Sequence, residues 1–227
     1  MMAEYRTRHS PKTIRMIMLI TATLMVGAIF SADAVLGNLP LIAAIFAMAL
    51  SHGVLAGDLR EARWPLLFQL PVHPVRYYYR VITRTLLLGI VLLSLIIVTA
   101  LILVESGQRH EIAGTGAGIL VFFVTFTLVS YGISSVIRNG EVELTVLYLA
   151  TGVAIALFLK SRGVPEGVRD AVSLLFFPID AILTYIGLWR GTSDYVMEPH
   201  YLPQLIFFPA AWLALITWRL SVLNRGE

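Results

Sequence analysis

The sequence predicts an all-α integral membrane protein with six transmembrane helices. Hydrophobic residues make up 58% of the 227 residues and charged residues only 14%, and the mean hydropathy is +0.81. Soluble domains carry about 25% charged residues, so this composition is typical of a chain embedded in lipid. The apolar runs approach the roughly 20 residues that a helix needs to cross a bilayer. Because the chain has no cysteine, disulfides and thiolate metal sites are excluded.

The apolar runs divide the chain, a single transmembrane domain of residues 1–227, into six expected spans. Between the first two, Gly37-Asn38-Leu39-Pro40 favours a tight turn. The fourth span is rich in Gly, Ser and Thr, which permit close helix packing in lipid. We expect the spans at about residues 14–35, 41–57, 77–104, 112–137, 142–160 and 203–220.

The segment 171–189 has the length of a span, but Pro178 and Asp180 interrupt it. It fits either a seventh span or a re-entrant helical hairpin that follows the polar loop 161–170. Lysine and arginine collect on the cytoplasmic side of membrane proteins. The hairpin places slightly more of the 17 Lys and Arg residues inside than a seventh span does. We therefore expect a re-entrant hairpin, cytoplasmic N- and C-termini, and a location in the cell membrane (inner or plasma membrane).

The polar segment 58–76 separates the second and third spans. Pro65 suits the first position of a short helix, because its missing N–H costs nothing there. Pro71 would end that helix, and Pro74 would begin the next one. Arginines recur every four residues and form a basic stripe at the start of the third span, at Arg76, Arg80 and Arg84.

This order of features resembles the type-2 ABC transporter permeases. Their coupling helix lies between the second and third of six spans and binds a separate ATP-hydrolysing subunit. The resemblance implies a cytoplasmic coupling helix here, whose ATPase contacts are Glu61, Leu66, Leu67, Leu70, Arg76 and Arg80. The family also has re-entrant helices before its last span. Two features differ from the family: Pro65 interrupts the coupling helix, and residues 1–13 are too few for a full amphipathic helix.

The resemblance implies a permease subunit, and the short external loops argue against a large substrate-capturing domain and favour an exporter. No G-x-x-x-x-G-K-[ST] motif is present, so we expect ATP and Mg²⁺ on a partner ATPase subunit, and no catalytic, cofactor or metal site in this chain. A second copy or a related permease would complete a homo- or heterodimer in membrane lipid, without nucleic acid. The scarcity of charges in the spans favours an apolar or amphipathic substrate, with Asp180 as a possible pathway residue.

Two other function classes are compatible with the sequence. A membrane scaffold or assembly subunit without transport would share every feature except the coupling segment. An intramembrane enzyme would need a nucleophile and a base, for which Ser134 or Ser135 with His52 are the nearest residues. His110 and His200 lack the spacing of a metal site. We expect the Gly-rich stretch 114–118 to support helix packing rather than phosphate binding.

Overall fold

The computed structural model describes residues 11–30, 32–51, 74–103, 109–137, 140–173 and 201–224. Within these ranges every regular element is an α-helix, which confirms the predicted all-α class for this part of the chain. Two of these helices are long and apolar enough to cross a membrane, over Val75–Leu103 and Gly116–Val136. The helices are α1 (Pro11–Phe30), α2 (Ala32–Ser51), α5 (Pro74–Leu103), α6 (Arg109–Val136), α7 (Glu141–Ser161), α8 (Glu166–Ser173) and α10 (Tyr201–Asn224).

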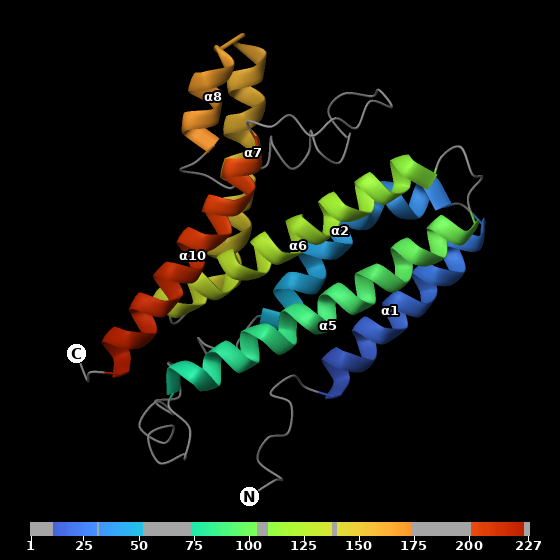
Figure 1. Ribbon diagram of the computed structural model, residues 1–227, viewed down its shortest axis with the longest axis horizontal. Coiled ribbons are helices and arrows are strands. Elements are labelled where there is room, and N and C mark those ends of the chain that lie inside the picture. The colour runs from blue at the N-terminus through green and yellow to red at the C-terminus, as the bar shows by residue number, and fades with distance from the viewer. Residues whose placement is uncertain are drawn as a thin grey trace, which may run out of the picture.

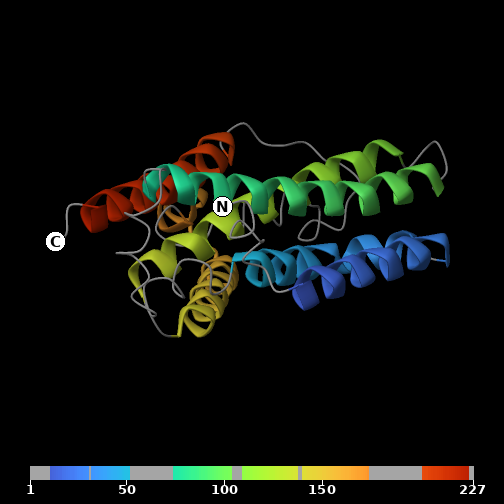
Figure 2. The same cartoon turned by 90° about the horizontal axis from the view of Figure 1, so that it is seen from below.

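Helix α6 is the centre of the bundle. It packs against α2, α5, α7 and α10, and 72% of its apolar stretch is buried, compared with 33% for α5. In Figure 1, α1 and α5 run side by side in one direction, and α2 and α6 run back in the other. Figure 2 shows α1 and α2 on one side of the bundle and α5 and α10 on the other. The α7–α8 hairpin extends away from these helices (Figure 1).

Helix α5 has two distinct faces along its 30 residues. It begins at Pro74, as predicted, since proline is favoured in the first helical turn. The face toward the bundle is buried and repeats with helical spacing, at Tyr78, Ile82, Thr85, Leu92, Leu93, Ile96 and Ala100. The opposite face is exposed over the whole length of the helix, so α5 lies at the edge of the bundle.

The predicted turn at residues 37–40 is wrong. Helix α1 ends at Phe30 and α2 begins at Ala32, so α2 runs through these four residues. Consequently the helices lie at 11–30 and 32–51 instead of the expected 14–35 and 41–57. The reason is a buried apolar stripe that already starts inside the predicted turn, at Leu39, Ala43, Phe46, Ala47 and Leu50. Its packing outweighs the local preference of Gly37 and Asn38 for a turn.

The polar loop predicted at 161–170 is also partly wrong, because α8 forms over Glu166–Ser173. Helix α7 ends in a Schellman motif. Gly163 adopts a φ of 62°, and the Val164 N–H donates to the Leu159 carbonyl at 3.2 Å. Of the predicted re-entrant segment, residues 171–173 belong to α8, and 174–189 lie outside the described residues.

Helix α10 contains Pro209 within its length and crosses α6 closely. At the crossing, the ring of Trp212 lies over Gly132, and a Cβ atom at position 132 would be only 2.1 Å from Trp212 Cε3. Small residues at such crossings let helix backbones approach closely in lipid. The Gly-rich start of α6 packs in the same way, because a Cβ at Gly116 would be 2.6 Å from Ile97 Cγ2.

Candidate functional site

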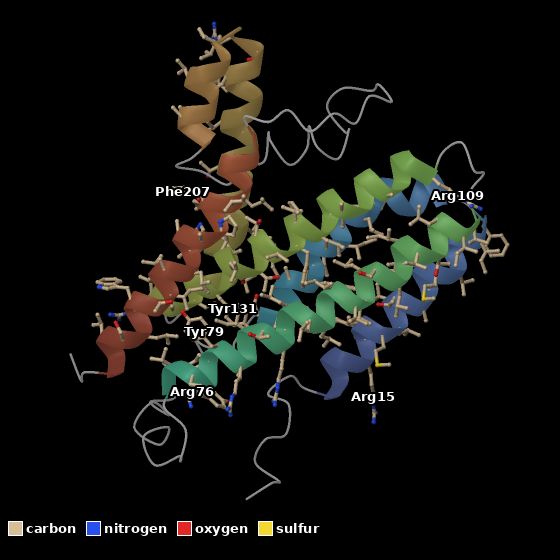
Figure 3. All side chains as sticks on the ribbon, viewed as in Figure 1. Arg15, Arg76, Tyr79, Arg109, Tyr131 and Phe207 are labelled. Atoms are coloured by element: carbon tan, nitrogen blue, oxygen red, sulfur yellow. The ribbon has the colours of Figure 1, made fainter. Side chains whose placement is uncertain are left out.

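The predicted basic stripe is present at the start of α5. Arg76, Arg80 and Arg84 share one face of the helix, and all three are exposed. Figure 3 shows Arg76 at one end of the bundle, Arg109, at the start of α6, at the other end, and Arg15 between them at the start of α1. This end of α5 is therefore the basic end, and it follows directly on the segment expected to contain the coupling helix.

Most of the other predicted site residues fall in ranges that the structure does not describe. These are Glu61, Leu66, Leu67 and Leu70 of the coupling segment, and Asp180 of the re-entrant segment. Their roles stay predictions. His52, the base considered for an intramembrane enzyme, also lies outside the described residues.

A second group of polar residues lies on the buried face of α6, where it meets α2. Ser51 of α2 and Ser130 of α6 are 2.6 Å apart between their Oγ atoms, and Ser51 Oγ is also 2.6 Å from the Ala47 carbonyl oxygen. A hydroxyl has one hydrogen, and the carbonyl can only accept. Ser51 therefore donates to Ala47, and Ser130 donates to Ser51. This hydrogen bond ties α2 to α6 inside the core.

Hydroxyls also join α5 to α6 and to α10. Thr85 Oγ1 of α5 lies 2.8 Å from the hydroxyl of Tyr131 of α6, and both side chains are buried. The Tyr79 hydroxyl of α5 is bonded to Thr217 Oγ1 of α10. Because Thr217 already donates to the Leu213 carbonyl, Tyr79 is the donor. Figure 3 shows Tyr79 and Tyr131 close to the point where α5, α6 and α10 meet.

Helix α10 makes a further polar contact near the end of α6. Arg219 Nε donates to the Ser135 carbonyl oxygen at 3.4 Å. Ser135 itself donates its hydroxyl to the Gly132 carbonyl at 2.6 Å. Together with the hydroxyl pairs, this bond links four helices by polar contacts that lie in the half of α6 nearer its C-terminus.

Ser134 is the exception in this group. Its hydroxyl is fully buried and has no hydrogen-bond partner among the described residues, as is also true of Thr125. A buried hydroxyl left unsatisfied costs about 1–3 kcal/mol. Ser134 lies one helical turn beyond Ser130, on the same face of α6. No group of three or more His, Cys, Asp or Glu residues that could hold a metal occurs within the described ranges.

Sequence reasoning found the Ser- and Thr-rich character of α6 but not its partners. The partners are single polar residues within or beside apolar runs, at Ser51, Thr85, Tyr79 and Thr217. The spacing of such a residue indicates only the face of its own helix on which it lies. In comparisons with protein-family models, curated proteins and solved structures, no match to this chain was found.

Proposed function

We propose that this chain is the permease subunit of an ATP-binding-cassette exporter, driven by a separate ATPase subunit. The observation that supports this most is the start of α5. A 30-residue helix begins at Pro74, directly after the Leu-rich segment 58–73, and its first turns carry exposed arginines. A helix that starts at a proposed ATPase contact and continues through the bundle would carry the movement of that contact into the membrane.

The same helix supports the proposed membrane topology. At 1.5 Å per residue, α5 is about 45 Å long, whereas the hydrocarbon core is about 30 Å thick. About ten residues therefore extend beyond the core, and the arginines occupy that excess at one end. Arginine-rich ends favour the cytoplasmic side. We therefore place the basic end of the bundle in the cytoplasm, within six spans, with both termini cytoplasmic and a re-entrant hairpin at 171–189.

The hydroxyl contacts give a route by which α5 would move its neighbours. Tyr79 and Thr85 lie in the first half of α5, near its basic end, and they bond to Thr217 of α10 and Tyr131 of α6. Displacing the start of α5 would pull on both helices, because breaking a buried hydrogen bond is unfavourable. Glu61, Leu66, Leu67 and Leu70 would make the ATPase contact, with Arg76 and Arg80 following at the same end of the bundle.

The proposed substrate is apolar or amphipathic, and two permease copies, or one copy and a related permease, would enclose its pathway. Among the described residues, the buried polar side chains carry hydroxyls, such as those of Ser130, Tyr131 and Ser134, and none of them is charged. A bundle without charged side chains in its interior offers no partner for an ion, because an unpaired charge is costly in the membrane. Such surroundings suit an amphipathic molecule better than an ion.

Co-purification with an ATPase and measurement of its activity test this function. The wild-type protein should co-purify with an ATP-hydrolysing partner. Leu67→Ala should lower the ATPase rate of that complex while the insertion of the variant into the membrane is unchanged. Leu147→Ala is the matched control, because Leu147 is an exposed leucine on α7. Equal ATPase rates in the wild type, Leu67→Ala and Glu61→Gln proteins would contradict coupling through this segment. The absence of any ATPase partner would leave the scaffold as the better description.

A further inference from the structure

We propose that the outer face of α5 binds an anionic glycerophospholipid. This face is one continuous exposed stripe, and its spacing of three or four residues keeps it on one side of the helix. Its first part is cationic, at Arg76, Arg80 and Arg84. Its remainder is apolar, with exposed side chains at Leu87, Val91, Leu95, Val98 and Ile102. A lipid has the same sequence of groups, a charged headgroup followed by hydrocarbon.

The dimensions of the stripe fit one leaflet. Arg76 and Arg84 are separated by about 12 Å along the helix axis, which spans the headgroup layer. From Leu87 to Ile102 the apolar part extends for about 22 Å. The hydrocarbon of one leaflet is about 15 Å thick, so acyl chains lying along this face would be covered over their full length.

The charge of the stripe favours an anionic headgroup. Neither α1 nor α5 has an acidic residue in its first turn, and neither has a basic residue in its last turn. Arg76 lies in the first turn of α5, where the helix dipole opposes a cation, so this arginine does not serve the stability of α5 itself. A guanidinium group binds phosphate with two parallel hydrogen bonds. Phosphate oxygens would therefore offset the unfavourable charge at this end.

Helix α1 repeats the pattern beside α5. Its Arg15 is exposed near the start of the helix, and exposed apolar residues follow at helical spacing, at Leu19, Val26 and Ile29. The two helices run in the same direction and pack against each other. Figure 3 shows Arg15 and Arg76 extending from the same edge of the bundle. Helix α1 is shorter and begins part-way along α5 (Figure 1), so each helix presents an arginine near its own start, followed by exposed apolar side chains.

The inference does not depend on the proposed export function, and purified protein in detergent tests it. The thermal unfolding midpoint is measured while phosphatidylglycerol or phosphatidylcholine with identical acyl chains is added. Phosphatidylglycerol should raise the midpoint more, because a ligand that binds only the folded state stabilises it. Each arginine replaced by glutamine should weaken phosphatidylglycerol binding about fivefold. Raising the salt concentration should reduce the difference between the lipids.

The control variant is Arg109→Gln, which removes an exposed arginine at the opposite end. The triple variant Arg76→Gln, Arg80→Gln, Arg84→Gln should lose the difference between the midpoint shifts caused by the two lipids, whereas Arg109→Gln should keep it. Arg80→Lys should keep more of this difference than Arg80→Gln. Equal effects of both lipids on the wild type would overturn the inference. So would equal losses in the triple variant and Arg109→Gln, or an equal shift with soluble glycerol phosphate, since the apolar part of the face would then contribute nothing.

Discussion

Replacing Gly132 by alanine should weaken the crossing of α6 and α10. The added Cβ would lie 2.1 Å from Trp212 Cε3 and 2.5 Å from Cζ3. Carbon atoms in contact prefer a separation of about 3.5–4.0 Å, so the indole ring would have to retreat by about 1.4 Å or more. Behind it, Tyr148 packs edge-on at 5.9 Å between ring centroids, and Phe208 lies at 6.3 Å. The ring is therefore held from more than one side.

The expected free-energy change follows from two opposing effects. Overpacking of a well-packed core costs about 1–3 kcal/mol. Alanine is favoured over glycine inside a helix by about 1 kcal/mol. The net destabilisation by Gly132→Ala should therefore be about 1 kcal/mol. Gly167→Ala in α8 is the control, because a Cβ there meets nothing within 4 Å. The control variant should be neutral or slightly stabilised, and the difference between the two variants isolates the steric cost.

Unfolding by sodium dodecyl sulfate, followed by the loss of helical circular dichroism, measures both variants. A third protein, Trp212→Leu, provides the background for a double-mutant cycle. Without the indole ring, Gly132→Ala should no longer destabilise. The reasoning is refuted if Gly132→Ala is as stable as Gly167→Ala, or if its cost is unchanged in the Trp212→Leu background.

Two further predictions concern the core and the topology. Ser51→Ala should lower the free energy of unfolding by about 1–3 kcal/mol, because it leaves the Ser130 hydroxyl without its acceptor. Ser130→Ala should lower it by only about 1 kcal/mol, since Ser51 keeps its bond to Ala47. Detergent unfolding of the single and double variants checks this order, and equal costs would contradict the assigned donors. The wild-type chain has no cysteine, so Arg225→Cys creates a unique labelling site near the C-terminus. With six spans, a membrane-impermeant maleimide should leave intact cells unlabelled and should react after permeabilisation; labelling of intact cells would contradict a cytoplasmic C-terminus.

The helices α5, α6 and α7 were predictable because their apolar runs are bounded by charged residues. Each begins and ends close to its expected limits of 77–104, 112–137 and 142–160. Hydropathy depends only on side-chain transfer into an apolar environment, so it is informative without knowledge of the fold. The start of α5 was predictable for a second reason, since Pro74 fits the first turn of a helix and not its interior.

The turn wrongly predicted at residues 37–40, inside α2, shows what local signals omit. Gly37 and Asn38 favour a turn by themselves, but Leu39 is fully buried together with Ala43 and Phe46. Which residues of α2 would be buried depended on its neighbours α1, α5 and α6, and these contacts are not encoded in a short stretch of sequence. The same holds for α8 (Glu166–Ser173), a short amphipathic helix that begins inside the predicted loop 161–170.

The hydroxyl pairs could not be predicted from the sequence, for a related reason. Tyr79 and Thr217 are separated by 138 positions in the chain, and Ser51 and Ser130 by 79. Periodicity assigns each to a helix face, but it does not determine which helices adjoin or at what height they pair. The candidate ATPase contacts came from a family resemblance, and the buried hydroxyls came only from the structure.

Pro209 divides α10 into a shorter part before it and a longer part after it. Proline has no N–H to donate to the carbonyl four residues earlier, so the helix lacks one backbone hydrogen bond at this point. The contacts of α10 with α5 and α6 described above, made by Trp212, Thr217 and Arg219, all follow Pro209 in the chain. The later half is thus anchored to its neighbours, and bending at the proline would tilt the first two turns without breaking those bonds. Phe208, directly before the proline, is buried in the core, whereas Ile206 and Phe207 are exposed, so a change of angle would move the turn before Phe208 most.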